Sequence, residues 1–276
     1  MARIPEWLGS LIERARAADG QPPFSDQSLL DLRAGERELL ALGEYAAALV
    51  SATEAELVVD PDVRGRGHGT ALIEAVLAEP HTELLVWAHG DHPAARALAA
   101  RFGFEPARRL LQLRRTQPGT SGSRQGGGTA GVRPFRPGVD EDAWLALNAR
   151  AFAFHAEQGS VNRADLDELE RETWFDADDF LLLWHDSALI GYCWLKVDGD
   201  IGELYVVGVD PDRQREGLGR LLVAAGLDRL AQRDVTTAAL YVEADNTPAL
   251  RLYESVGFAE HSVDIQYRLT RFTRRS

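Results

Sequence analysis

Two short stretches of the sequence place glycines where a bound phosphate would need them. "VDPDVRGRGHGTAL" begins at Val59 and "VDPDRQREGLGRLL" begins at Val209. In each stretch a β-rich run ends at a proline, and a Gly-x-Gly step then opens an apolar helical run. This arrangement leaves backbone N–H groups unpaired at the positive end of a helix dipole, which suits an anionic group. The alternative, a helix cap that happens to hold glycine, fits two matching copies poorly.

The spacing of these glycines excludes two common nucleotide motifs. The P-loop needs Gly-x4-Gly-Lys-Ser/Thr, and neither stretch has the lysine. The dinucleotide fingerprint needs Gly-x-Gly-x-x-Gly, whereas the first stretch has Gly65, Gly67 and Gly69. The phosphate must therefore belong to a ligand that neither motif serves.

The elements that position these loops occur twice in the same order. In the second half, a hairpin is predicted with its turn at Asp186–Ser187, followed by strand, helix, strand, helix and strand. These elements are expected at residues 178–186, 188–199, 201–211, 218–234, 237–245, 246–258 and 261–269, and their counterparts at residues 46–61, 68–79, 82–91, 92–104 and 107–115. Aligning Asp91 with Asp245 also brings both Gly-Phe pairs into register, which indicates an internal duplication of an α/β unit.

A glycine-rich segment separates the two copies. Residues 117–131 read "QPGTSGSRQGGGTAG", and a segment with almost no apolar side chains cannot bury enough surface to become ordered. We therefore predict a flexible linker at 117–131 between an N-terminal domain, 1–116, and a C-terminal domain, 132–276.

Composition limits the partners and the compartment. A net charge of -13 and a sequence pI of about 5.0 argue against nucleic acid as a partner. No apolar run reaches the roughly 18 residues of a membrane span, and the N-terminal stretch lacks the apolar core of a signal peptide. The single cysteine, Cys193, excludes an intrachain disulfide framework. We expect a cytoplasmic monomer without membrane contact, and no metal, because His155 and His185 lack ligand spacing.

The two loops and a second block resemble a known family. Residues 64–69 and 214–219 match the Arg/Gln-x-x-Gly-x-Gly/Ala loop of the GCN5-related N-acetyltransferases (GNAT), and "ALYVEADNTPALRLYESVGF" is similar to the family's second block. Together the blocks are specific and cover most of both halves. The resemblance implies an α/β fold of two tandem GNAT domains, each a mixed, mostly antiparallel sheet flanked by helices. It also implies acetyl-CoA as the co-substrate.

The resemblance carries coenzyme contacts onto both copies. In the second copy the implied residues are Val207, Gly208, Val209, Gln214, Arg215, Glu216, Gly217, Leu218, Gly219, Arg220, Asn246, Thr247, Pro248, Ala249, Leu250 and Arg251. In the first copy they are Leu57, Val58, Val59, Gly65, Arg66, Gly67, His68, Gly69 and Thr70.

A closer resemblance concerns the acceptor. The second half looks like the tandem members that acetylate the cysteinyl amine of cysteinyl-glucosaminyl-inositol, a small molecule. The acceptor contacts that this resemblance implies are Asp26, Glu157, Lys196, Glu203 and Tyr241. On the sequence alone, a surface lysine is the favoured interpretation of Lys196, and only the resemblance places an acceptor contact there. A helix N-cap is the alternative for Asp26.

Acetyl transfer requires that the amine lose a proton, that the thioester carbonyl be polarised and that the leaving thiolate gain a proton. The second half has a candidate group for each requirement. The resemblance places a catalytic base at Glu203, since a carboxylate can remove the proton of the amine. The backbone of 207–209 is expected to flank the acetyl group, at a bulge opened by Gly208. Tyr253 lies two helical turns after Asn246 and is expected to protonate the leaving thiolate. The alternatives are a solvated charge at the strand end for Glu203 and an ordinary half-buried aromatic for Tyr253.

The first copy is predicted to be non-catalytic. When the two copies are aligned through their glycine loops, Val59 with Val209, Thr53 takes the place of Glu203, although Glu54 and Glu56 are adjacent. In the register of the second block, His92 replaces Asn246 and Ala99 replaces Tyr253. A loop kept without its acid and base suggests a domain that holds the coenzyme without turnover.

Two other functions remain open from the sequence. The same loop, base and acid would serve a tandem N-acetyltransferase for another small amine or a peptide α-amine. A non-catalytic acyl-CoA-binding regulator would need only the loops. A sugar–inositol acceptor, in contrast, needs polar groups that can bind its hydroxyls.

Overall fold

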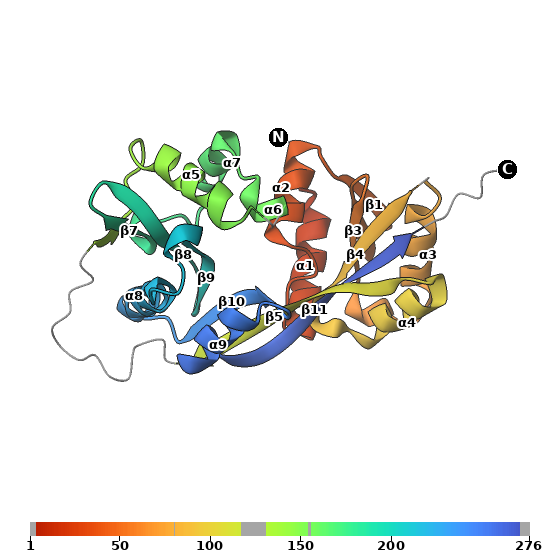
Figure 1. The fold of residues 1–276 in the computed structure, drawn as a ribbon. Coiled ribbons are helices and arrows are strands. Elements are labelled where there is room, and N and C mark those ends of the chain that lie inside the picture. Colours follow the sequence, from red (N-terminus) through yellow and green to blue (C-terminus); the bar gives the residue numbers. More distant parts are fainter. Residues whose placement is uncertain (1–3, 80, 117–130, 154–155, 271–276) are drawn as a thin grey trace. The chain divides into compact units, whose positions relative to one another are not determined.

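The computed structural model describes residues 4–79, 81–116, 131–153 and 156–270, which form two compact units (Figure 1). The N-terminal unit comprises Met1–Leu111, Glu243–Asp245 and Ser262–Ser276, and the C-terminal unit comprises Gln112–Val242 and Asn246–His261. Residues 117–130 of the predicted linker, and His155, lie outside the described residues.

The N-terminal unit is built on a sheet with the strand order β1-β2-β3-β4-β11. The strands β3 and β4 are parallel and the other neighbours in this order are antiparallel. Its elements are α1 (Glu6–Asp19), α2 (Asp26–Ala34), β1 (Glu38–Leu42), β2 (Ala46–Val50), β3 (Glu54–Val59), η1 (Pro61–Val63), α3 (His68–Val76), β4 (Glu83–Ala88), η2 (His89–Asp91), α4 (Pro93–Phe102), most of β5 (Glu105–Thr116) and most of β11 (Ala259–Thr270).

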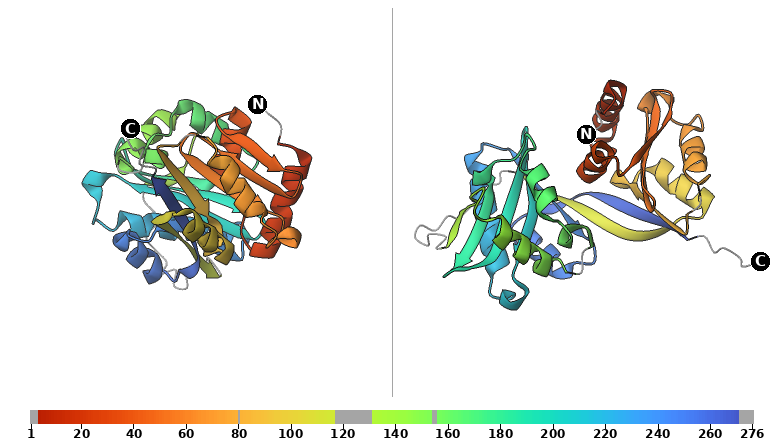
Figure 2. Two further views of the ribbon diagram at one scale, coloured as in Figure 1. Left: turned by 90° about the vertical axis from the view of Figure 1, so that its right-hand side faces the viewer. Right: turned by 90° about the horizontal axis from the view of Figure 1, so that it is seen from above.

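Helices cover both faces of this sheet. Alternate residues of β2 point to opposite faces, as a strand requires. Leu49 packs with Leu11 of α1, whereas Ala48 packs with Leu72 of α3. Figure 2 shows α1 and α2 on one side of the N-terminal strands and α3 and α4 on the other. Each face therefore has its own apolar core.

The C-terminal unit repeats this plan with the strand order β10-β9-β8-β7-β6. Again one pair, β9 with β10, is parallel. Its elements are β6 (Val132–Pro134), α5 (Glu141–Ala151), α6 (Ala156–Gly159), α7 (Arg163–Leu169), η3 (Ala177–Asp179), β7 (Phe180–His185), β8 (Ala188–Asp198), β9 (Ile201–Val209), η4 (Pro211–Arg213), α8 (Leu218–Gln232), β10 (Thr237–Glu243) and α9 (Thr247–Ser255). The predicted hairpin at Asp186–Ser187 is confirmed by the antiparallel pairing of β7 with β8.

Two different cores hold the C-terminal sheet. On the α5 and α7 face, aromatic rings dominate: Phe180 stacks on Trp194 with ring centroids 4.2 Å apart, and Trp144 meets both rings edge-on. On the opposite face α8 approaches closely, because a Cβ on Gly226 would lie 2.8 Å from the sulfur of Cys193. Burial raises the pKa of the Cys193 thiol to about 12, so this cysteine stays a protonated packing residue at neutral pH.

The last strand of each half of the sequence, β5 or β11, crosses into the compact unit formed mainly by the other half. β11 follows α9 in the chain, yet from Ser262 onward it belongs to the N-terminal unit, where Ile265–Thr270 pair with β4. Conversely, β5 ends the first copy, and from Gln112 onward it belongs to the C-terminal unit. The compact units are thus not contiguous in sequence. Among the described residues, no helix is both long and apolar enough to cross a membrane.

Candidate active site

Both glycine loops form the same left-handed turn ahead of a helix. Gly67 caps α3 with φ of 89° and Gly217 caps α8 with φ of 80°, a left-handed conformation that favours glycine. Two residues earlier, Gly65 and Arg215 also have positive φ, at 75° and 68°. Alternating left-handed residues turn successive N–H groups toward one point, which makes a nest for phosphate oxygens. A Cβ on Gly67 or Gly217 would meet no protein atom within 4 Å, so the space over the loop is open to a ligand.

Behind each loop the two parallel strands of the sheet separate. β9 pairs with β10 only through Glu203, opposite Ala239. β3 pairs with β4 only through Glu56, opposite Trp87. Beyond these points the two strands are no longer paired with each other as they lead toward the loops. An extended ligand arm with amides can pair with an unpaired strand edge.

A bulge in β9 lies earlier than the sequence predicted. The ladder between β8 and β9 shifts by one residue between the pairs Trp194–Val206 and Leu195–Leu204, so that Tyr205 is the extra residue. The prediction of a bulge at Gly208 is therefore wrong. Gly208 instead admits the ring of Tyr192, since a Cβ there would lie 2.4 Å from the ring.

Three of the predicted acceptor residues lie on one face of the C-terminal sheet. Glu203 and Lys196 are cross-strand partners, which places both side chains on the same side. Tyr241 follows two residues after Ala239, the partner of Glu203, and so shares this face. The hydroxyl of Tyr241 accepts a hydrogen bond from Nε2 of Gln112 at 2.6 Å.

Tyr253 and Asn246 belong to α9, whose start is as predicted. The side chain of Asn246 accepts a hydrogen bond from the N–H of Ala249 at 3.2 Å and caps the helix. Burial, with a smaller effect from Cys193, raises the pKa of Tyr253 well above that of an ordinary tyrosine. The phenol therefore holds its proton at neutral pH.

The remaining predicted residues that the structure places in helices lie in α8, α9, α6 and α2. Residues 218–220 form the first turn of α8, and 247–251 form the first part of α9. Nη2 of Arg220 donates to Oγ of Ser255 at 2.7 Å and ties these two helices together. Glu157 lies in α6. Asp26 is the exposed first residue of α2, whose N-cap is Ser25, so the N-cap alternative for Asp26 is wrong by one residue.

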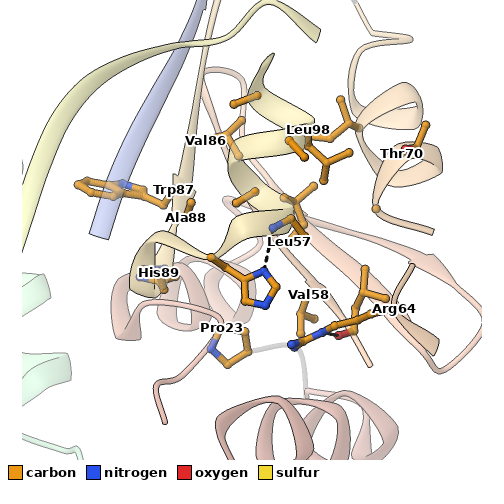
Figure 3. A pocket seen from close by; sticks show the side chains of 18 of the residues that line it. Pro23, Leu57, Val58, Arg64, Thr70, Val86, Trp87, Ala88, His89 and Leu98 are labelled. Carbon is orange, nitrogen blue, oxygen red and sulfur yellow. Dashed lines mark hydrogen bonds between the residues drawn. The ribbon is translucent and has the colours of Figure 1, made fainter. Parts of the chain in front are cut away.

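In the N-terminal unit, eight of the nine predicted coenzyme residues line a single cavity of about 490 Å³. They are Leu57, Val58, Val59, Gly65, Gly67, His68, Gly69 and Thr70. Figure 3 shows its walls: Leu57 and Val58 come from β3, and Val86 and Ala88 come from β4. The ninth residue, Arg66, donates to the backbone carbonyl of Asp62 at 3.3 Å.

Comparison with known proteins identifies the family. The acetyltransferase (GNAT) family model matches residues 143–258, and the acetyltransferase (GNAT) domain model matches residues 34–106. The mycothiol acetyltransferase of Clavibacter sepedonicus is 51% identical, over 94% of this chain and 90% of the relative. That of Streptomyces avermitilis is 46% identical, over 94% and 89%. The chain belongs to the mycothiol acetyltransferase family.

Solved structures agree on the fold. A tandem GNAT protein from the clavulanic acid biosynthesis pathway superimposes with a TM-score of 0.68 at 20% identity, over 96% of this chain and 94% of the other. A GCN5-related N-acetyltransferase from Sphaerobacter thermophilus gives 0.68 at 21%, over 98% and 95%. The predicted fold class, two tandem GNAT domains, is confirmed, and this member of the mycothiol acetyltransferase family is an N-acetyltransferase that uses acetyl-CoA.

The first copy keeps a carboxylate at the position of Glu203, contrary to the sequence register. Glu203 lies opposite Ala239, the duplication aligns Ala239 with Leu85, and Leu85 lies opposite Glu54. The extra residue Tyr205 in β9 accounts for the shift of one. The prediction that Thr53 stands in place of Glu203 is therefore wrong, because an alignment through the loop cannot register a bulge.

Glu54 is nevertheless committed to other groups. Nη2 of Arg37 donates to its Oε2 at 2.9 Å, and only 6% of the Arg37 side chain is exposed. Nε2 of Gln266, from β11, donates to its Oε1 at 3.2 Å. Trp87 stands where the second copy has Tyr241, and the guanidinium of Arg108 lies 5.3 Å from its ring centroid. Both oxygens of the Glu54 carboxylate therefore accept hydrogen bonds from other side chains of the unit.

The sequence favours loop polarity for His89 in "AHGDH", but the structure places His89 in a buried charged cluster beside the cavity, so that interpretation is wrong for His89. Nδ1 of His89 donates to Asp264 at 2.9 Å, and Glu56 accepts from the N–H and hydroxyl of Ser25 at 2.8 and 2.9 Å. Nε2 of His89 lies 3.8 Å from Glu56. Burial opposes the charge on His89, but the hydrogen bond to Asp264 and the charges of both carboxylates raise its pKa to about 10. The imidazole is therefore charged at neutral pH and joins β3, the end of β4 and β11.

Acid and base groups elsewhere give no indication of a metal centre. Within the part of the chain that the structure describes, no group of three or more His, Cys, Asp or Glu side chains is arranged to hold a metal ion.

Proposed function

We propose that this chain transfers the acetyl group of acetyl-CoA to the cysteinyl amine of 1D-myo-inositol 2-(L-cysteinylamino)-2-deoxy-α-D-glucopyranoside, the step that completes mycothiol. The observation that supports this most is the shared face of Glu203, Lys196 and Tyr241 at the point where β9 and β10 separate. A coenzyme arm entering between the strands would bring its thioester to the base, and polar groups for a hydroxyl-rich acceptor lie beside that base. The name of the relatives agrees with this acceptor.

The reaction proposed for the C-terminal unit needs a base, an oxyanion donor and an acid. Glu203 takes a proton from the acceptor ammonium, directly or through one water, so that the free amine attacks the thioester carbon. A backbone N–H in 207–209 stabilises the oxyanion that forms. As the intermediate collapses and the C–S bond breaks, Tyr253 donates its proton to the thiolate of CoA, and the second proton that the nitrogen loses returns through solvent to the Tyr253 phenolate. The loop at 214–220 and the start of α9, 246–251, are proposed to hold the pyrophosphate and the coenzyme arm.

The N-terminal unit is proposed to hold coenzyme without turnover. Its loop and its cavity suit the pyrophosphate and the arm, but Glu54 is paired with Arg37 and the position of Tyr253 holds Ala99. Under this proposal the halves at 1–116 and 132–276 divide the work, and the segment at 117–131 links them. We also propose a cytoplasmic monomer, since the substrates are small molecules and the chain has a single, buried cysteine.

A panel of acceptors tests the proposed function. CoA formation and acetylated product are measured by chromatography with cysteinyl-glucosaminyl-inositol, with cysteine amide and with a peptide that has a free α-amine. The sugar–inositol acceptor should exceed cysteine amide in kcat/KM by at least about a hundredfold, because a site built to bind hydroxyls discriminates strongly against an analogue without them. Equal rates on all three amines would favour a general amine acetyltransferase, and no CoA formation with any of them would favour a regulator.

A further inference from the structure

An aromatic group on the acceptor face of the C-terminal unit has a role that the reaction above leaves unassigned. Trp174 lies between α7 and η3, and its ring centroid is 5.2 Å from Nζ of Lys196. The ring of Tyr205 lies 5.3 Å from Trp174 and 5.8 Å from Trp194. All of these side chains are on the α5 and α7 face, which is the face of Glu203.

The bulge explains why this group exists in one copy only. The extra residue of a bulge re-aims its side chain, and Tyr205 is that residue. The ladder between β2 and β3 in the N-terminal unit runs from Ala46–Val59 to Val50–Ala55 without a shift, so it supplies no equivalent ring. The C-terminal unit thus has both the ring of Tyr205 beside Trp174 and the separation of β9 from β10 directly after Glu203.

The geometry fixes the ammonium of Lys196 relative to the base. A lysine side chain has several rotatable bonds, and holding its ammonium at one place costs rotamer entropy. A cation over the face of a tryptophan is stabilised by the ring quadrupole. The ring of Trp174 packs against Tyr205 and Trp194, with centroids 5.3 and 5.8 Å away. Because Lys196 is the cross-strand partner of Glu203, an ammonium held over Trp174 remains on the side of the sheet where the acceptor meets its base.

We propose that Trp174 is a positioning residue for the acceptor: its ring holds Lys196 beside Glu203, where the ammonium donates hydrogen bonds to hydroxyls of the sugar–inositol. This rests on the proposed function. Trp174 acts through Lys196, so it affects recognition of the sugar–inositol part and not the attack of the amine.

The experiment compares Trp174→Leu with a matched tryptophan. Trp184 packs against the same aromatic core and has its own cation, since the guanidinium of Arg133 lies 4.9 Å from its ring. Trp174→Leu should raise KM for cysteinyl-glucosaminyl-inositol about threefold to thirtyfold, the range of a cation–π contact, with kcat nearly unchanged. Trp184→Leu should lower Tm about as much as Trp174→Leu does, because both remove a ring from the same core, but should leave KM within about twofold of wild type. Trp174→Phe, which keeps a ring, should restore most of the affinity.

A double variant and a second acceptor decide how Trp174 acts. In a Lys196→Met background, Trp174→Leu should raise KM no further, because the interaction it supports is already gone. With cysteine amide, Trp174→Leu should match wild type in kcat/KM. An undiminished effect in the Lys196→Met background, or an equal loss with cysteine amide, would overturn the positioning role. A wild type that acetylates cysteine amide as well as the sugar acceptor would refute the proposed acceptor instead, while a wild-type preference that survives Trp174→Leu would refute only the role of Trp174.

Discussion

In the C-terminal unit β9 and β10 separate directly after Glu203, whereas in the N-terminal unit β3 and β4 remain paired for two residues beyond Glu54. The two glutamates hold equivalent strand positions, so the difference does not lie in the presence of a carboxylate. It lies in one inserted residue, Tyr205, and in what surrounds each carboxylate. Glu54 is held by the buried Arg37, and Glu203 lies opposite Lys196 on a face with Tyr241. The two copies therefore keep a glutamate at the same strand position and surround it with different groups.

The sharpest way to test this comparison is to remove each glutamate in turn. Glu203→Gln should lower kcat by about 10² to 10⁴ near neutral pH, the usual worth of a general base, with little change in coenzyme affinity. Glu54→Gln keeps the shape and one acceptor for Arg37, and should leave kcat within about twofold of wild type. CoA formation by the two purified variants gives both values. Equal losses would mean that both units catalyse.

Replacing Tyr253, the proposed acid, is expected to have the next largest effect. Tyr253→Phe removes the phenol and keeps the ring, so kcat should fall about 10- to 100-fold, at the lower end of general-acid contributions, while KM for either substrate holds. Because burial raises the pKa of Tyr253, the phenol stays protonated from pH 7 to 9, and the ratio of wild-type to variant kcat should be constant over that range. A ratio that falls with rising pH would show that the proton comes from another group. An unchanged kcat would leave Tyr253 as a packing residue.

The two loops allow a matched pair of glycine substitutions. Gly217→Val and Gly67→Val each force a β-branched residue into positive φ, so both should cost stability of about 1 to 3 kcal/mol. Only Gly217→Val should also raise the coenzyme KM in turnover, about tenfold, by filling the space over the catalytic loop. Steady-state kinetics with thermal unfolding separates the two effects. Loss of turnover in a folded Gly67→Val protein would contradict the proposal that only the C-terminal unit catalyses the reaction.

The smallest expected effect is a pH-dependent change in thermal stability when His89 is replaced. The pKa of His89 is raised in the folded protein to about 10, above its ordinary value near 6.5. Its contribution to stability is therefore complete below about pH 6.5 and is lost as pH rises toward 10. His89→Gln should lower Tm most at pH 6, and its difference from wild type should shrink by pH 9.5. The exposed His185, replaced in the same way, should show a small difference at every pH; a similar trend for both variants would contradict the assignment to the cluster.

The sequence was most informative where structure is local. Gly-x-Gly spacing and proline positions predicted the loops at 65–69 and 215–219 and the helices after them, because left-handed residues and helix caps are set by a few neighbours. The position of the bulge was not predictable, since nothing in "GELYVVGV" marks Tyr205 as the extra residue. Contacts such as Arg37 with Glu54, Gln266 with Glu54 and Asp264 with His89 join residues distant in sequence, and only the folded sheet brings them together.

The pairing of β11 with β4 has a consequence for how the protein is made. About 180 residues separate Ala88 from its partner Ile265. At a synthesis rate of about 5 to 20 residues per second, the edge of β4 that β11 covers waits roughly 10 to 35 s after it leaves the ribosome. During that time the first unit is a nascent chain with an open strand edge, which is a site of misassociation. The N-terminal unit, although translated first, is completed only when β11 emerges, after the described part of the C-terminal unit.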